Sequence, residues 1–265
     1  MELPPLGFDL HVHTHYSDGA DSPQAVVDQC ERRLSVVSIC DHDTIAAYDH
    51  LPEAPALDVL PGIEISTGVD GRSIHLLGYF RDGFPNSFRD AVGELEHDRR
   101  SRIQEGVTTL RERGVPLRWR ALEEALGEGV PCRSHVARAL IKVGVARSPR
   151  VVFARYLQGA FRGPRIGVAE AIQLVRDNGG LAVWAHPDAA TMDSHGVELA
   201  AAGLQGVEVY RRGGKQAPRR RKVERFAERH GLLKTGGSGH HFSTPRRRLG
   251  EFSIPFELLP ESLRR

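Results

Sequence analysis

The stretch DLHVHTHYSDG, residues 9–19, places three histidines at alternate positions close to the start of the sequence. Apolar and polar residues alternate strictly from Phe8 to His13, and this period of two is typical of a β-strand. His11 and His13 therefore belong to the same face of the strand, with their side chains about 7 Å apart. Two imidazoles at this spacing can bind one divalent cation such as Zn, Mn or Fe. The alternative is a polar strand face whose histidines bind no ion.

The composition of the 265-residue sequence is that of an ordinary globular protein, with 26% charged residues and a net charge of +2. We find no run of about 18 apolar residues and no secretion signal, so we expect a cytoplasmic protein without a membrane partner. Three widely spaced cysteines indicate reduced thiols rather than a disulfide framework. Histidine is the unusual component, with 13 residues against five tyrosines and two tryptophans.

Short apolar runs that are typical of strands recur along the sequence, and helical patterns lie between most of them. The Ser22-Pro23 pair, for example, predicts the start of a helix, because serine is a good N-cap and proline suits the first turn. Parallel strands need helical crossovers, so about seven strands predict an α/β sheet that closes as a barrel. After the first strand, the expected strands are Val36 to Cys40, Leu57 to Ile65, Ile74 to Phe80, Leu181 to Ala185, Val207 to Tyr210 and Leu232 to Thr235.

Metal-binding residue types gather where these strands end. The residues at or just past a predicted strand end are His11, His13, His42, Glu64, His186 and the pair His240-His241. His75 lies just inside its strand, from which it can reach the same rim. In barrels of this kind the C-terminal strand ends form the active face, so the pattern predicts a metal site at one rim.

The middle of the sequence, residues 85–163, is charged and has helical periodicity. We expect a helical insertion here, acting as a lid or substrate-specificity element over a barrel domain formed by residues 1–84 and 164–265. Apolar residues from Phe88 onwards define one buried helix face. The charged run 98–100 lies off that face.

Two basic clusters are candidates for anion binding. Arg133, His135 and Arg138 lie near the N-terminus of a predicted helix, where free N–H groups and guanidinium groups can bind a substrate phosphate. The cluster from Arg211 to Arg225, with the run from Arg246 to Arg248, follows a predicted rim strand. In both cases the alternative is a solvated basic surface without a ligand.

Several ordered motifs resemble the PHP (polymerase and histidinol phosphatase) superfamily, in particular its small stand-alone phosphoesterases that act on nucleotides. The motifs are His-x-His…Ser-Asp-Gly (11–19), Asp-His-Asp-Thr (41–44), Gly-Ile-Glu-Ile-Ser (62–66), His75 followed by Gly-Tyr, Arg-Ser-His-Val-Ala-Arg (133–138), Ala-His-Pro (185–187), Gly-Val-Glu-Val-Tyr (206–210) and Gly-Gly-Ser-x-His-His (236–241). The resemblance implies a distorted (β/α)7 barrel, two to three divalent ions (Mn, Fe or Zn) and hydrolysis of phosphate esters.

The same resemblance implies three linked metal sites. They would use His11, His13 and Glu64; then Glu64 as a bridge with His75 and His186; and then Asp18, His42 and His241. Glu64, His42 and His186 are the expected catalytic residues, acting with a metal-bridged hydroxide that attacks the phosphate. Arg133, His135 and Arg138 would bind the substrate. This chemistry needs no protein nucleophile, and we find no Ser-His-Asp or cysteine pattern that predicts one.

One position departs from the family motif, which reads Gly-Ser-Asp-x-His with the aspartate as a metal ligand. The residue at the aspartate position here is Gly239, which has no side chain to coordinate an ion. Three interpretations stay open: His240 is a substitute ligand, a water fills the position, or the site is impaired.

The predicted function is therefore hydrolysis of a phosphate monoester in a nucleotide, a nucleoside bisphosphate or a sugar phosphate. The first alternative is a phosphodiesterase of the 5′-exonuclease type that acts on the ends of short RNA or DNA. The second is a catalytically impaired module that binds metal and phosphate. The expected partner is a small phosphorylated, nucleotide-like substrate, and the oligomeric state stays open.

Overall fold

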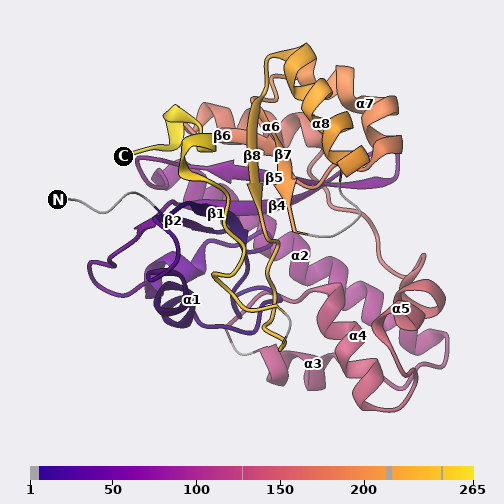
Figure 1. Ribbon diagram of the computed structural model, residues 1–265. Coiled ribbons are helices and arrows are strands. Elements are labelled where there is room, and N and C mark those ends of the chain that lie inside the picture. Colours follow the sequence, from indigo (N-terminus) through magenta and orange to yellow (C-terminus); the bar gives the residue numbers. More distant parts are fainter. Residues whose placement is uncertain (1–5, 127, 213–216, 246) are drawn as a thin grey trace.

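Eight strands in the described part of the chain form two sheets in this computed structural model (Figure 1), which describes residues 6–126, 128–212, 217–245 and 247–265. The first sheet is parallel and contains β1 (Phe8–Val12), β2 (Val36–Ile39) and β3 (Asp58–Val59). The second contains, in spatial order, β4 (Gly62–Val69), β5 (Arg72–Tyr79), β6 (Leu181–Trp184), β7 (Gly206–Arg211) and β8 (Leu233–Gly237).

The two sheets meet along two short seams. At one seam Val12 bridges His240, beside β1 and β8, and at the other His42 bridges Glu64, beside β2 and β4. The predicted α/β class is confirmed. A closed barrel is not confirmed, because the described strands form two separate sheets and only isolated bridges, with no continuous ladder, lie between them. At the first seam a Cβ on Gly237 would lie 2.4 Å from the Cβ of His11, so the close approach requires glycine.

The prediction of parallel strands with helical crossovers is wrong for β4, β5 and β6. These strands are antiparallel neighbours, and Asp70 and Gly71 alone connect β4 to β5. Both residues have positive φ, +46° and +73°, as two-residue hairpin turns require. The Asp-Gly pair was a signal for this hairpin. The predicted strand from Leu57 to Ile65 is also divided, because Pro61, which lacks an N–H donor, separates β3 from β4.

Helices cover the sheets and form a separate group beside them. The α-helices are α1 (Pro23–Cys30), α2 (Asn86–Glu112), α3 (Trp119–Leu126), α4 (Arg133–Lys142), α5 (Pro149–Val152), α6 (Val168–Asp177), α7 (Ala189–Ala201) and α8 (Ala217–His230). Short 3-10 or π segments cover Ala46–His50, Phe153–Leu157, Phe256–Leu258 and Glu261–Leu263. No helix in the described ranges combines the length and apolarity needed to cross a bilayer. All three cysteines are free and buried.

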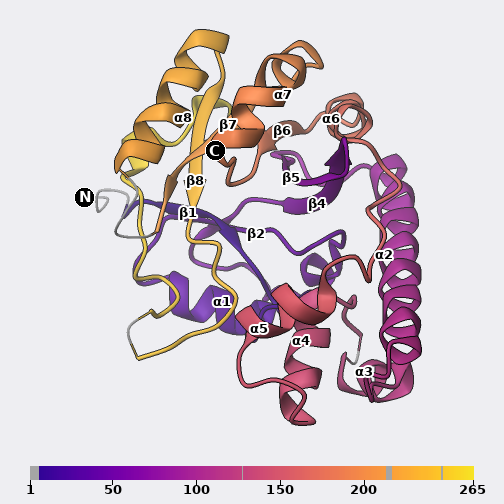
Figure 2. The ribbon, with the colours of Figure 1, turned by 90° about the vertical axis from the view of Figure 1, so that its right-hand side faces the viewer.

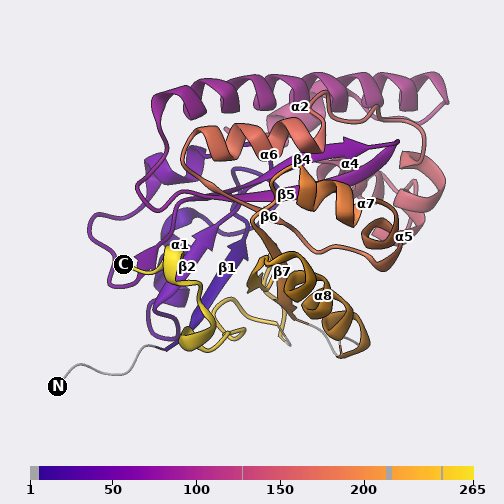
Figure 3. The same ribbon diagram turned by 90° about the horizontal axis from the view of Figure 1, so that it is seen from above.

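Helix α2 joins two hydrophobic cores. Phe88 and its apolar neighbours pack on the sheet core, whereas Ile103, Val107 and Leu110 pack with residues of α3, α4 and α5 in a second core. Figure 2 shows this long helix running from the level of β4 and β5 to α3, and Figure 3 shows it lying along one side of the molecule. Asp98 and Arg99, which lie off the apolar face of the helix, are nevertheless buried where α2 passes from one core to the other.

The start of α1 gives a local test of the fold. Ser22 Oγ accepts a hydrogen bond from the Ala25 N–H at 3.1 Å, as the sequence predicted. Ser22→Ala should lower the free energy of unfolding by about 1 kcal/mol, because an orphan N–H at the helix start loses its acceptor. Urea unfolding measures the change. Ser101→Ala, in the interior of α2, is the control and should not destabilise the protein; equal losses in both variants would contradict the capping role.

Candidate metal centre and active site

The Glu64 carboxylate lies at the centre of a cluster of imidazoles. Its side chain is 1% exposed. The ring nitrogens nearest to its oxygens are those of His75 at 2.8 Å, His186 at 2.9 Å, His42 at 3.1 Å, His11 at 3.2 Å and His13 at 3.4 Å. Five imidazoles therefore share one buried carboxylate.

The strands bring these histidines together from distant parts of the sequence. His11 lies on β1 and His42 just past β2, at the rim that the sequence predicted. His75 lies near the start of β5, and it reaches the same rim because β5 runs antiparallel to β4 and pairs His75 with Ser66. His186 follows β6 with a φ of +35°, a left-handed conformation that is uncommon for a residue with a side chain.

A second cluster adjoins the first around Asp18. Asp18 Oδ1 lies 3.2 Å from His241 Nε2 and 3.7 Å from His42 Nε2, and Ser134 Oγ donates a hydrogen bond to Asp18 Oδ2 at 2.7 Å. Ligand atoms within 4.8 Å of one another form three sets: His13, Asp18, His42 and His241; His11, His13 and Glu64; and His42, Glu64 and His75. Because these sets share residues, cations bound in them would be neighbours.

The donor atoms are arranged as a cation would require. His11 Nε2 and His13 Nε2 face each other at 3.1 Å, and the buried His13 Nδ1 and Asp18 Oδ1 make no hydrogen bond of acceptable geometry. Buried polar atoms rarely lack a partner. Imidazole nitrogens and carboxylate oxygens that converge in this way suit Mn, Fe or Zn.

Protonation states in the cluster also favour cation binding. Burial by itself would raise the pKa of Glu64, but the surrounding imidazoles of His42, His11 and His75 hold that pKa well below its ordinary range. Burial lowers the pKa of His42 to about 3 and takes the pKa of His13 well below its ordinary value. An ionised carboxylate with neutral imidazoles is the form that binds metal ions. His11 differs, since Glu64 and Glu208 outweigh its burial and raise its pKa to about 10.

Sequence reasoning assigned no role to Glu208. This fully buried residue on β7 has Oε1 3.0 Å from His11 Nδ1, and its Oε2 accepts a hydrogen bond from the His186 backbone N–H at 2.8 Å. It therefore orients two members of the cluster at once. An acidic residue within the apolar run Gly-Val-Glu-Val-Tyr was a signal for a buried, partnered carboxylate.

Arginines face the clusters across a cavity of about 120 Å³. Asp18, His42 and His75 line it together with Arg99, Arg102 and Arg133. The Arg99 guanidinium donates to Asp43 Oδ2 at 2.8 Å and to Ser66 Oγ at 2.6 Å, and Arg102 donates to the same Asp43 oxygen at 2.8 Å. Asp43 thus holds the guanidinium groups of Arg99 and Arg102 beside the clusters. Its backbone φ is +54°.

Of the three predicted substrate-binding residues, the structure brings one to this cavity. Arg133 begins α4, lines the cavity and makes no hydrogen bond or ion pair with any residue in the described ranges. His135 Nδ1 accepts a hydrogen bond from the Cys132 N–H at 3.0 Å and so caps the helix. Arg138 does not line the cavity, and substrate binding by His135 and Arg138 stays a prediction.

Known proteins resemble the chain in sequence and in structure, although no family model matches it. The 5′-3′ exoribonuclease Rnm of Salmonella typhimurium is 30% identical over 267 residues, covering 92% of this chain and 88% of that protein. The 3′,5′-nucleoside bisphosphate phosphatase of Chromobacterium violaceum is 28% identical, covering 88% of this chain and 86% of the relative. A solved structure from Bifidobacterium adolescentis, assigned as a metal-dependent phosphoesterase, is 29% identical with a TM-score of 0.80, covering 97% and 95% of the two chains. The chain belongs to the PHP family.

As a PHP phosphoesterase, the chain is a hydrolase that acts on phosphate esters and uses divalent metal ions. Its departure from the PHP motif at Gly239 lies beside the first cluster, because the Gly239 N–H donates to the His11 carbonyl at 2.8 Å. His240 Nε2 lies 3.5 Å from Asp21 Oδ2, and His240 belongs to none of the three ligand sets found in the described residues. A ligand role for His240 stays a prediction.

A change at Glu208 tests whether this residue orients the histidines of the cluster, because Glu208 is not itself a proposed metal ligand. Glu208→Gln should weaken metal binding by about 10- to 100-fold, because His11 and His186 lose the anion that orients them. Competition with a chromogenic chelator measures the affinity. Glu94→Gln, an exposed change on α2, is the control. Equal affinities in both variants would exclude the orienting role of Glu208.

Proposed function

We propose that this PHP enzyme hydrolyses a terminal phosphate monoester of a nucleotide-like substrate with two to three divalent ions, Mn, Fe or Zn. The observation that carries the proposal is the Glu64 carboxylate shared by five imidazoles, next to the Asp18 cluster and opposite the arginines. In the reaction a bond forms between a water oxygen and phosphorus, the P–O ester bond breaks, and the leaving oxygen takes up a proton.

Three groups of residues would each hold one ion. The first ion would be held by His11, His13 and Glu64, the second by Glu64 with His75 and His186, and the third by Asp18, His42 and His241. When bound, the ions lower the pKa of water and offset the charge of the phosphoryl oxygens. Glu64, His42 and His186 are the proposed catalytic residues, since His42 and His186 both contact the Glu64 carboxylate and all three would hold ions next to the reacting phosphate.

Arginines supply the second half of the site. Arg133 is the proposed phosphate ligand, because its guanidinium has no partner among the described residues and a planar guanidinium matches phosphate oxygens. Arg99, held by Asp43, adds a fixed positive charge beside it. All three cavity arginines lie within residues 85–163, which supports a substrate-specificity role for this segment.

The second candidate function is removal of nucleotides from the 5′ end of short RNA. The similarity to the exoribonuclease Rnm favours it. The basic cluster from Arg211 to Arg225 could serve such a polyanion, but residues 213–216 and Arg246 lie outside the described residues. Arg219 donates hydrogen bonds to the Pro187 carbonyl, which supports a packing role for this part of α8. A cytoplasmic location stays a prediction of the sequence.

Metal content per chain and turnover of an aryl phosphate with added Mn²⁺ test the proposal, for the natural chain and for Gly239→Asp. We expect turnover by the natural chain that a chelator abolishes. We expect Gly239→Asp to bind its ions more tightly, because only Arg211 Nη2 lies within 4 Å of a Cβ built at this position, at 3.5 Å. The φ of +59° is left-handed and strains the new side chain, although aspartate adopts this conformation more readily than most residues.

The other results are equally informative. A natural chain without turnover, together with metal and activity gained in Gly239→Asp, would support the impaired module instead. Absence of turnover in both proteins, with metal bound, would overturn the proposed hydrolysis. Gly83→Asp is the control, since Gly83 also has positive φ and open space but lies away from the clusters.

A further inference from the structure

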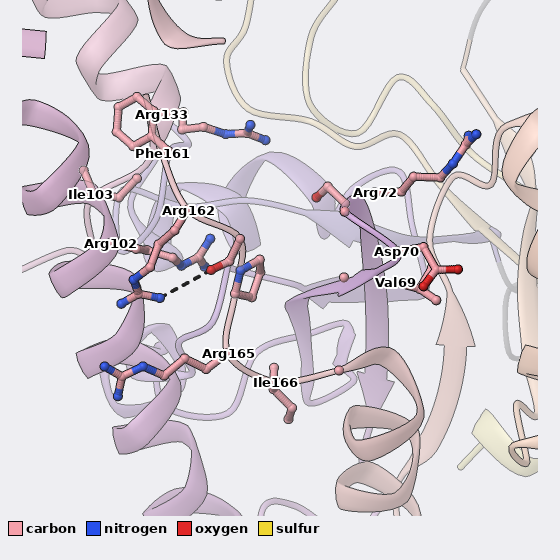
Figure 4. A pocket seen from close by; sticks show the side chains of 16 residues that line it. Val69, Asp70, Arg72, Arg102, Ile103, Arg133, Phe161, Arg162, Arg165 and Ile166 are labelled. Carbon is pink, nitrogen blue, oxygen red and sulfur yellow. Dashed lines mark hydrogen bonds between the residues drawn. The ribbon is translucent and has the colours of Figure 1, made fainter. Parts of the chain in front are cut away.

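A second, larger cavity continues from the one beside the metal clusters. It has a volume of about 400 Å³, within the range of small-molecule sites. Ser73, Arg102, Ile103 and Arg133 line both cavities, so a bound molecule can extend from one into the other. Figure 4 looks into the larger cavity, where the Arg133 side chain extends into the space between the two walls.

The two walls come from segments that are distant in sequence. Residues 68–73, at the β4–β5 hairpin turn, form one wall, and residues 161–167, the loop before α6, form the other. Figure 4 shows Asp70 and Arg72 on one side, and Arg162 and Arg165 on the other. The lining contains one carboxylate, that of Asp70, and five arginines: Arg72, Arg102, Arg133, Arg162 and Arg165.

The carboxylates behind the walls leave a surplus of positive charge. Asp98 lies 2.7 Å from Arg162 and 3.4 Å from both Arg102 and Arg165. Arg102 also pairs with Asp43 at 2.8 Å, and Asp43 is shared with Arg99. Glu105 adds a second partner for Arg162 at 2.8 Å. Arg72, like Arg133, makes no side-chain hydrogen bond or ion pair within the described ranges, and its guanidinium interacts electrostatically with Asp188 beyond ion-pair distance. A concave wall with unmatched cations attracts an anion.

An aromatic ring completes the cavity. Phe161 lies against α2 at Gly106, where a Cβ would come within 2.1 Å of its Cδ1 atom. Any residue larger than glycine at position 106 would displace the Phe161 ring, so glycine is what allows the ring to pack against the helix. A ring beside phosphate-binding cations can stack on a base.

We propose that this second cavity binds the phosphate group on the leaving portion of the substrate, the one that is not hydrolysed. The inference rests on the proposed function, because it takes the metal clusters to hold the reacting phosphate. In both possible substrates this second phosphate lies one nucleoside away from the reacting phosphate. It is either the other phosphate of a nucleoside bisphosphate or the next phosphodiester of a short RNA.

Steady-state kinetics with matched substrates tests the subsite. The substrates are adenosine 3′,5′-bisphosphate, the 5′-phosphorylated dinucleotide pApA, both adenosine monophosphates and an aryl phosphate. We expect at least one two-phosphate substrate to have a kcat/KM about tenfold above the monophosphates. Arg72→Ala and Arg165→Ala, one from each wall, should each remove most of that advantage through KM, since a charged hydrogen bond is worth about tenfold.

The matched control is Arg229→Ala, an exposed arginine on α8 outside both cavities. Preference for the bisphosphate alone identifies that source, and preference for pApA alone identifies RNA. No preference for a second phosphate, or a preference that both wall variants retain, overturns the subsite.

If neither the natural chain nor Gly239→Asp hydrolyses an aryl phosphate, the proposed function is wrong, and this result leaves the subsite untouched. Titration calorimetry with the same nucleotides then tests whether the second cavity binds a phosphate. Bisphosphate binding that is about tenfold weaker in Arg72→Ala supports it, and equal affinities for bisphosphate and monophosphate overturn it.

Discussion

The burial of one carboxylate, Glu64, is the constraint on which the structure depends. Removing an anion from water is costly unless partners surround it, and here five imidazoles do so. The seam at which His42 bridges Glu64 joins β2 to β4, and the other seam runs beside His11. The two sheets therefore meet where the cluster assembles, and the fold and the site require the same contacts.

The site has two halves of opposite character. The anionic and imidazole half comes from strand ends and the turns after them, and the cationic half comes from α2 and α4. Helix α2 fixes the position of one half of the site relative to the other, because its start packs on the sheet core and its end packs on the second core. Arg99 lies between these contacts, and its bond to Asp43 ties the helix to the loop after β2.

Under the proposed function, this division would separate the chemistry from the choice of substrate. The clusters offer the same donors whatever the leaving group is, whereas the arginines and Phe161 can select what extends from the phosphate. If the second cavity binds substrate as proposed, changes in residues 161–167 or in the hairpin turn should alter the substrate without disturbing Glu64.

The sequence by itself indicated the α/β class, the start of α1 and the strand-end histidines that gather around Glu64, because periodicity and residue type report local structure and ligand chemistry. Asp18 and the division into three metal sites came from the resemblance to the PHP superfamily, and this assignment stays a prediction. The Asp-Gly turn was equally readable, although the prediction missed it. Only the tertiary structure decided that Glu208 orients His11, that Arg99 is buried, and that two cavities join at Arg133. These features are contacts between segments far apart in the chain, and no local pattern specifies which distant charge a buried group will meet.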